Sequence, residues 1–428
     1  MKKLMLSMAA VPLLVGGLSV TASAADGINV LNDVKVSGQI RPRYEYADVK
    51  DNGLDAGQAL TSRVKLNASA NLFGVEGLNA NVGLIGVYDF GWSSENGFNQ
   101  GKTEWSANPD GSYEKIVLGP DNDKIVDPAT AMLSNLEMTY KVNKTLLHVG
   151  RGQVNLDNQR FIGTVGWRQL ERSYDSAFIA DSTIPNLNIL AAYVWGLEGV
   201  ASNAQTNTAT VLLHANYKVM DELSITAYDY MIANFADIYG AALTGKINAG
   251  PAKLSYRAEY AMEADNTMEY GSNSVTNSVD ADYYNIDVSA NISGVIVGVD
   301  YEFMSGADGD KTTFISPLGT NHKFNGWADV YLGGHAGTGL IDMNGKIGYT
   351  AKGFGKVLAV YHQFLADTEV DGQDDMGSEI DFLYANKISA VNGLSVLLKG
   401  ALFSGGDIGQ TKDVEKYWVQ LDYKFSTK

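Results

Sequence analysis

The stretch Tyr417-Trp418-Val419-Gln420-Leu421-Asp422-Tyr423-Lys424-Phe425 decides the fold of this chain. Every second residue, from Tyr417 to Phe425, is apolar or aromatic, and most of the residues between them are polar. Successive side chains of a β-strand point to opposite faces, so this alternation predicts a strand with one face suited to lipid and one suited to water. A strand of about ten residues with two such faces is the unit of a transmembrane β-barrel.

The same period of two residues recurs along the chain, for example at 252–262 and 282–292. Short turns such as 219–222 and 391–393 join some of these segments. Other connections are long and polar. Short turns at one end of the strands and long loops at the other end are typical of outer-membrane barrels. The long connections are 92–131, 196–208, 264–281, 305–339 and 367–377. The pattern predicts an all-β fold, a closed transmembrane antiparallel barrel of about 18 strands (16 to 18). The strands are expected near 35–47, 60–72, 79–91, 133–142, 145–151, 173–181, 187–195, 209–218, 223–231, 237–247, 252–262, 282–292, 294–304, 340–350, 356–366, 378–388, 394–403 and 415–425.

A soluble β-sandwich or β-helix also alternates and is the alternative fold. Its apolar face would pack inward, and tyrosines would have no reason to gather at strand ends. In this chain aromatic residues crowd the ends of the apolar faces, as expected of the girdles at membrane–water interfaces. These residues are Tyr44, Tyr46, Tyr140, Tyr301, Phe303, Tyr349, Tyr423 and Phe425. Their placement favours the barrel.

The first residues predict an exported protein. Two lysines precede an apolar run that ends near Val20, and Ala22-Ser23-Ala24 provides a cleavage-like site. A transmembrane helix is the alternative, but the run contains Ser, Pro and Gly-Gly and is shorter than the roughly 20 residues that a bilayer requires. We therefore expect a cleaved signal peptide at 1–24, a single barrel domain at 25–428, and a location in the outer membrane of a Gram-negative bacterium.

Charged residues on the polar faces are the candidate pore residues. The first two strands carry a basic stripe at predicted lumen positions, formed by Arg41, Arg43, Arg63 and Lys65. The formal net charge of the chain is −17, so acidic residues dominate elsewhere. We expect a lumen of mixed sign, in which charges are screened less than in bulk water. The other candidates on the wall are Arg257, Asp300, Glu302 and Asp381.

Three stretches carry a resemblance to a known family. The longest reads GRGQVNLDNQRFIGTVGWRQ at 150–169, and the others read HKFNGWAD at 322–329 and GSEIDF at 377–382. With them the chain resembles the alginate export family of outer-membrane barrels, and its overall pattern is also similar to porins of comparable size. The resemblance implies a barrel of about 18 strands with a basic constriction. It bears on the fold more than on the transported solute.

The segment 150–169 has two interpretations. In the local one, its arginines pair with nearby carboxylates, so that Arg160, Arg168 and Arg172 bind Asp157, Glu171 or Asp175. In the other, the segment is longer than a tight turn, folds into the lumen and brings Arg160 and Arg168 to the constriction. A barrel of about 18 strands is too wide for its own wall side chains to fill, so an inward segment is needed to make it selective.

No catalytic motif supports an enzyme. The five histidines lie in no metal or nucleophile motif. The stretches 308–310 and 371–375 are acidic, but they lack the spacing and the closing Glu of a calcium loop. We therefore expect no enzymatic activity, no cofactor, no metal and no nucleic-acid partner.

The predicted function is that of a porin-like channel for passive diffusion of small polar or charged solutes, surrounded by outer-membrane lipid and lipopolysaccharide. The alternative is an exporter of an anionic polysaccharide, and an outer-membrane hydrolase comes third. The sequence leaves both a monomer and a homotrimer open.

Overall fold

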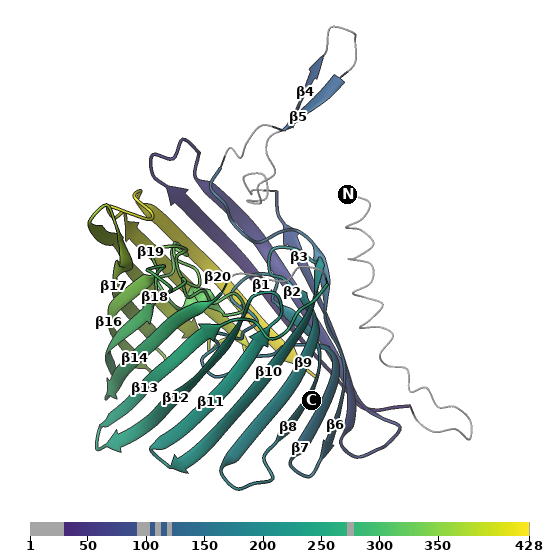
Figure 1. Cartoon of the computed structure of the whole chain (residues 1–428). Helices are drawn as coiled ribbons and strands as arrows, with labels where there is room; N and C mark the ends of the chain where they lie inside the picture. The colour runs from purple at the N-terminus through teal and green to yellow at the C-terminus, as the bar shows by residue number, and fades with distance from the viewer. Residues whose placement is uncertain (1–29, 92–102, 108–112, 118–121, 272–277, 428) are drawn as a thin grey trace.

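Eighteen antiparallel strands close into one barrel in the computed structural model (Figure 1). The structure describes residues 30–91, 103–107, 113–117, 122–271 and 278–427. Strands that follow one another in the chain pair with each other, except that β3 pairs with β6 and that β4 and β5 form a separate hairpin. The barrel strands are β1 (Leu31–Val49), β2 (Gly57–Leu72), β3 (Leu78–Asp89), β6 (Ala131–Val142), β7 (Thr145–Gly152), β8 (Ser173–Asp181), β9 (Leu187–Glu198), β10 (Gln205–Met220), β11 (Leu223–Ile232), β12 (Ala236–Ala249), β13 (Ala252–Ala264), β14 (Asp280–Ile292), β15 (Val295–Met304), β16 (Leu340–Ala351), β17 (Gly355–Val370), β18 (Gln373–Lys387), β19 (Leu394–Ser404) and β20 (Val414–Ser426), and the hairpin strands are β4 (Thr103–Ala107) and β5 (Tyr113–Val117).

Pairing of the first and last strands closes the barrel. β1 and β20 run antiparallel in continuous register from Ser37 opposite Ser426 to Val49 opposite Val414. Closure gives the two end strands partners for their backbone N–H and C=O groups, which lipid cannot supply. The predicted fold and strand number are confirmed.

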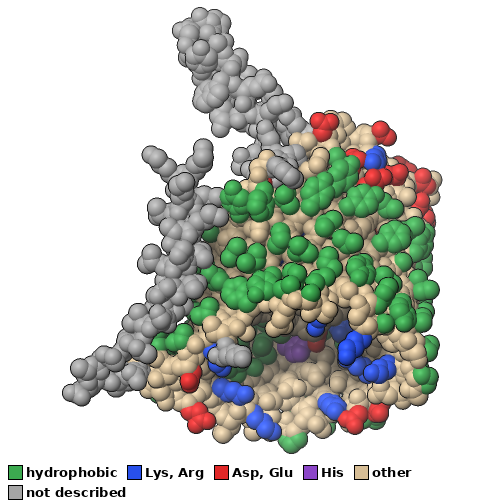
Figure 2. Space-filling view, turned by 180° about the vertical axis from the view of Figure 1, so that it is seen from behind, with side chains coloured by type: hydrophobic (Ala, Val, Ile, Leu, Met, Phe, Trp, Pro, Cys, Tyr) green, Lys and Arg blue, Asp and Glu red, His purple; other side chains and the backbone are tan. Residues whose placement is uncertain are grey.

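The strands alternate between an apolar outer face and a polar inner face, as predicted. On β20, Val419 is 51% exposed on the outside, whereas its neighbour Trp418 is 1% exposed on the inside. On β15, Val299 is 64% exposed, and Glu302 on the opposite face is 3% exposed. Figure 2 shows the apolar side chains as a broad band across the side of the outer wall that is in view. Across the described ranges, no helix is long and apolar enough to span a membrane.

The connections differ from the predicted ones at three places. The long connection expected at 196–208 is reduced to residues 199–204, because β9 and β10 extend into it. The prediction of a long loop at 367–377 is wrong, because β17 and β18 extend until only Asp371 and Gly372 remain between them as a turn. Both turn residues have positive φ, 54° and 78°, which is the Asp-Gly geometry that joins two strands tightly. In addition, the region 92–131 contains the β4–β5 hairpin, which the period-two pattern did not indicate. The predicted signal peptide at 1–24 lies outside the described residues.

A hydrophobic core fills part of the lumen. Phe161 and Phe314 come from two segments that fold inward, and they pack against Tyr283 of the barrel wall, with ring centroids 5.1–5.9 Å apart. The cluster continues through buried wall residues such as Phe364 and Trp418. The wide barrel is therefore narrowed by its own loops.

Candidate functional site

Two inward segments narrow the lumen. The first inner segment, residues 153–172, connects β7 to β8, and the second inner segment, residues 305–339, connects β15 to β16. They are joined to each other by backbone hydrogen bonds, in which the Gly163 N–H donates to the Leu318 carbonyl at 2.9 Å and the Thr320 N–H donates to the Gln159 carbonyl at 2.9 Å. The expectation that 150–169 folds into the lumen agrees with this arrangement.

Arg160 anchors the first inner segment to the acidic side of the wall. Its Nε lies 2.8 Å from the Glu302 carboxylate, and its Nη2 donates to Asn325 of the second inner segment at 3.0 Å. Arg160 and Glu302 are 1% and 3% exposed. Arg160 thus ties both inner segments to β15 and lies apart from the basic stripe.

Arg168 links the first inner segment to β1. Its Nη1 donates to Glu45 at 2.9 Å, and its Nη2 donates to Asp329 of the second inner segment at 2.8 Å. Burial disfavours the charge of Arg168, but Glu45, Asp329 and Asp127 together raise its pKa above the usual value.

The local pairing considered for this segment is not formed. Glu171 binds Lys65 and lies 3.4 Å from Arg63, and Asp175 binds Arg151 at 2.7 Å. The reason is geometric, because the segment turns inward and its arginines reach carboxylates of the wall and of the second inner segment.

Three tryptophans surround the Nζ of Lys399 on β19. The Nζ lies 3.8 Å from the ring centroid of Trp327, 4.4 Å from that of Trp167 and 5.6 Å from that of Trp418. His322 stacks on Trp167 at 4.5 Å and completes the cage. Since Trp167 and Trp327 belong to different inner segments, a wall lysine holds both segments through cation–π attraction.

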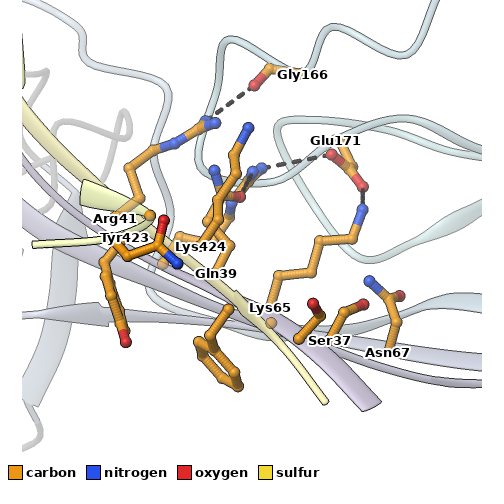
Figure 3. Close-up of a pocket in the computed structure, with 15 residues that line it drawn as sticks. Ser37, Gln39, Arg41, Lys65, Asn67, Gly166, Glu171, Tyr423 and Lys424 are labelled. Carbon is orange, nitrogen blue, oxygen red and sulfur yellow. Dashed lines mark hydrogen bonds and ion pairs between the residues drawn. The ribbon is translucent and has the colours of Figure 1, made fainter. Parts of the chain in front are cut away.

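Three of the four residues of the basic stripe line a cleft at the short-turn end of the barrel (Figure 3), and the fourth, Arg43, is buried beside it. The cleft has a volume of about 800 Å³, and Arg41, Arg63 and Lys65 contribute to its wall. Figure 2 shows the hollowed mouth of the barrel with Lys and Arg side chains around it. The cleft runs along β1, β2 and β20, so the open part of the lumen is off-centre. Its lining also includes Ser37, Gln39, Asn67, Glu171, Tyr423 and Lys424.

Each cation of the stripe has a carboxylate beside it. Arg41 donates from Nε to Asp422 at 3.1 Å and from Nη1 to the Gly166 carbonyl at 2.9 Å. Lys65 and Arg63 share Glu171. The cleft therefore presents alternating fixed charges rather than a uniformly positive wall.

A second cleft of about 450 Å³ continues from the first along β2, β3 and β6. Side-chain amides and hydroxyls dominate its lining, and among them Asn135 donates to Gln153 at 3.0 Å. Its charged residues are Lys35, Lys65 and Glu137, and the Glu137 carboxylate lies 2.8 Å from His148. The two clefts share Lys65, so together they form one polar recess on one side of the lumen.

The remaining predicted site residues line other parts of the lumen. Arg257 binds Glu259 on its own strand at 2.8 Å, and Asp300 accepts a hydrogen bond from Asn285 at 2.8 Å. Asp381 accepts a hydrogen bond from the Trp327 N–H at 3.2 Å. The structure does not bring these residues together with the basic stripe.

Sequence reasoning missed the part that Lys399 and Asp329 play in holding the inner segments, and it paired Glu171 with the wrong cations. Lys399 has no motif of its own, Asp329 was quoted only within the family resemblance, and Glu171 binds Lys65 and Arg63 of the wall. A usable signal was the long, aromatic segment 305–339, whose Trp327 was quoted only as part of a family resemblance. Within the described part of the chain, no group of three or more His, Asp or Glu side chains is arranged to hold a metal ion.

Several solved structures have this fold. OccK1 (OpdK) of Pseudomonas aeruginosa is 13% identical, with 93% of this chain and 100% of that chain covered and a TM-score of 0.68. OccAB3 of Acinetobacter baumannii is 15% identical, with 92% and 100% covered and a TM-score of 0.70. OpdK of Pseudomonas aeruginosa, solved with vanillate, is 12% identical, with 93% and 100% covered and a TM-score of 0.68. No family model and no curated protein matches the sequence.

These likenesses confirm the porin-like barrel as a fold. They leave the resemblance to the alginate export family as a prediction, because it rests on the three quoted stretches alone.

Proposed function

We propose that this chain is an outer-membrane channel through which small polar or charged solutes diffuse passively, and that it has no catalytic role. The observation that carries this proposal is the off-centre polar cleft beneath the two inner segments, with Arg41, Arg63 and Lys65 on its wall. A barrel of this width without inner segments would be a wide pore that does not discriminate between small solutes. With them, solutes must pass close to fixed charges.

The paired charges suit transient binding. Glu171 holds Lys65 and Arg63, and Asp422 holds Arg41, so none of these cations captures a counterion at full strength. A solute with an anionic group can exchange for part of these contacts and then leave, because conduction requires binding that is favourable but weak. Vanillate, which OpdK was solved with, is a small carboxylate and is a suitable probe for this chain.

One observation favours the second candidate, export of an anionic polysaccharide. Lysines gather at the short-turn mouth of the barrel. Each lies an even number of residues from buried residues of its own strand, so its side chain faces the lumen. They are Lys35, Lys141, Lys246, Lys253, Lys387 and Lys424. Such a mouth attracts polyanions that arrive from that side. The carboxylates that pair with the basic stripe weigh against this function, because a polyanion would meet them next.

Planar-bilayer recording of the purified protein tests the proposal. We expect stepwise conductance, and a reversal potential in a salt gradient that departs from zero. A correctly folded barrel that gives no conductance steps, with solute entry into liposomes no faster than through protein-free liposomes, would contradict a channel. Block by an oligomeric uronate added at the short-turn side, and by no small carboxylate, would favour the exporter.

The surroundings of the channel follow from the same proposal. The apolar outer band is expected to contact outer-membrane lipid, and the long-loop end is expected to contact lipopolysaccharide. Both a monomer and a homotrimer are compatible with this band, and mass measurement in detergent distinguishes them.

A further inference from the structure

A third segment covers part of the inner wall next to the cleft that Arg41, Arg63 and Lys65 line. This lid segment, residues 122–130, precedes β6 and lies inside the barrel against β1 and β2. Ile125 is fully buried between Ala47 and Ala59 of the two strands. Asp123 accepts hydrogen bonds from the Val49 N–H and from Asn52, each at 2.6 Å. The lid segment therefore occupies the inner face of the β1–β2 wall.

The cleft ends along β1 at Arg43. Gln39 and Arg41 line the cleft and are 7% and 8% exposed, whereas Arg43, Glu45 and Ala47 do not line it and are at most 2% exposed. Arg43 lies 4.2 Å from the ring centroid of Trp167, and its Nη2 donates to the Trp167 carbonyl. The cleft along this wall thus ends where Trp167 and the lid segment cover Arg43.

Asp127 is the contact that joins the lid segment to this point. Its carboxylate lies 3.4 Å from the Nη1 of Arg43 and accepts a hydrogen bond from the Gln169 N–H at 2.9 Å. Gln169 is in turn fixed by its donation to Thr61 at 2.9 Å. One carboxylate therefore connects the lid segment, the first inner segment and the β1 wall.

We propose that Asp127 is an internal latch, whose carboxylate occupies the cationic site of Arg43 and the Gln169 N–H and thereby holds the lid segment over the route along the β1–β2 wall. Release of Asp127 frees the lid segment from Arg43 and uncovers the part of the β1–β2 wall, next to the cleft, on which the lid segment packs. This inference rests on the proposed channel function, since it describes how that channel opens.

The latch is suited to release because Arg43 is shared. The Glu45 carboxylate lies 3.9 Å from the Nη1 of Arg43, and the Gln420 side chain accepts a hydrogen bond from the Nε of Arg43 at 3.0 Å. Arg43 thus remains partnered when Asp127 leaves, so opening does not strand a buried charge. The hydrogen bonds of Asp123 keep the start of the lid segment attached to β1 while its middle moves.

Single-channel recording of Asp127→Ala tests the latch. We expect the ratio of open to closed time to rise by on the order of tenfold, because a hydrogen-bonded charge pair is lost. Asp127→Glu keeps the carboxylate and is expected to restore a large part of the closed time. Asp371→Asn, in the exposed β17–β18 turn at the same end of the barrel, is the matched control and is expected to behave as the wild type.

A reversible cross-link separates a latch from general loosening. The chain has no cysteine, so Ala59→Cys with Ile125→Cys, placed at two residues in contact, can be oxidised without competing thiols. In the Asp127→Ala background, oxidation should return the channel to the closed state, and reduction should reopen it.

The outcomes are distinct. If Asp127→Ala folds, conducts and keeps the wild-type open-to-closed ratio, the latch is overturned while the channel function stands. The same holds if the oxidised cross-link leaves the raised open time unchanged. Absence of conductance in every variant and in the wild type would instead remove the channel function itself.

Discussion

The Nε2 of His322 lies 2.7 Å from the Nζ of Lys399, and its Nδ1 lies 2.5 Å from the Asp329 carboxylate. An ammonium has only hydrogens to donate, so Nε2 must accept, and Nδ1–H then donates to Asp329. This pair of contacts fixes one neutral tautomer. Protonation of His322 would place two cations against each other inside the tryptophan cage.

The stability of the inner segments is expected to fall in acid. Burial lowers the pKa of His322 to about 3 from its ordinary value near 6.5, although Asp329 opposes the shift. The unfolded chain then binds a proton at His322 that the folded protein excludes. Folding free energy is lost as the pH falls below about 6.5, by at most about 1.4 kcal/mol per pH unit until about pH 3. Urea unfolding of the reconstituted protein between pH 7 and pH 4 measures this slope.

The control for this titration is His322→Gln, which can still donate to Asp329 and accept from Lys399. Its pH slope should be shallower than that of the wild type by the His322 contribution. Equal slopes in the two proteins would mean that His322 does not titrate in this window.

The buried pair of Arg160 and Glu302 predicts a strong effect of removing one partner. In Glu302→Ala the guanidinium of Arg160 remains buried without its carboxylate, which costs about 3–5 kcal/mol. Thermal unfolding should show the loss, and open-channel noise should increase because the inner segments come loose from β15. The double variant Arg160→Met with Glu302→Leu should recover much of the stability. A double variant as unstable as Glu302→Ala would contradict this account.

The lipid-facing wall predicts a difference between two neighbouring positions on β15. Val297 is 39% exposed on the apolar face, so Val297→Arg should cost about 2–4 kcal/mol if it lies near the bilayer midplane. Asp300 points into the lumen, where it accepts hydrogen bonds from Asn285 and Asn344, and Asp300→Ala should cost far less. Reversible unfolding in lipid vesicles compares the two, and equal costs would mean that the two faces were assigned the wrong way round.

The strands could be predicted from the sequence because each one repeats the same local rule. Val419 and Leu421 had to face lipid, whichever strand came next to β20. The position of Arg160 could not be predicted in this way, because its partners Glu302 and Asn325 lie more than a hundred residues away in the chain. Asp127 lies in a segment without periodicity, and its role follows only from where that segment packs. The turn at 371–372 was missed because polar residues near it resembled a loop, although they lie on strands that extend beyond the predicted ends.

The last prediction concerns ion selectivity. Arg41, Arg63 and Lys65 line the cleft, and Arg43 is kept unchanged because it holds the lid segment. In the triple variant with Gln at these three positions, Glu171 and Asp422 remain without their cations, so the reversal potential should move toward cation preference. Glu171→Gln should move it in the opposite direction, because Lys65 is then freed. Both changes are measured in bilayers under a potassium chloride gradient, with Lys412→Gln in the long-loop end as the control. If neither variant shifts the potential, the cleft does not carry the ions, and a different part of the lumen determines selectivity.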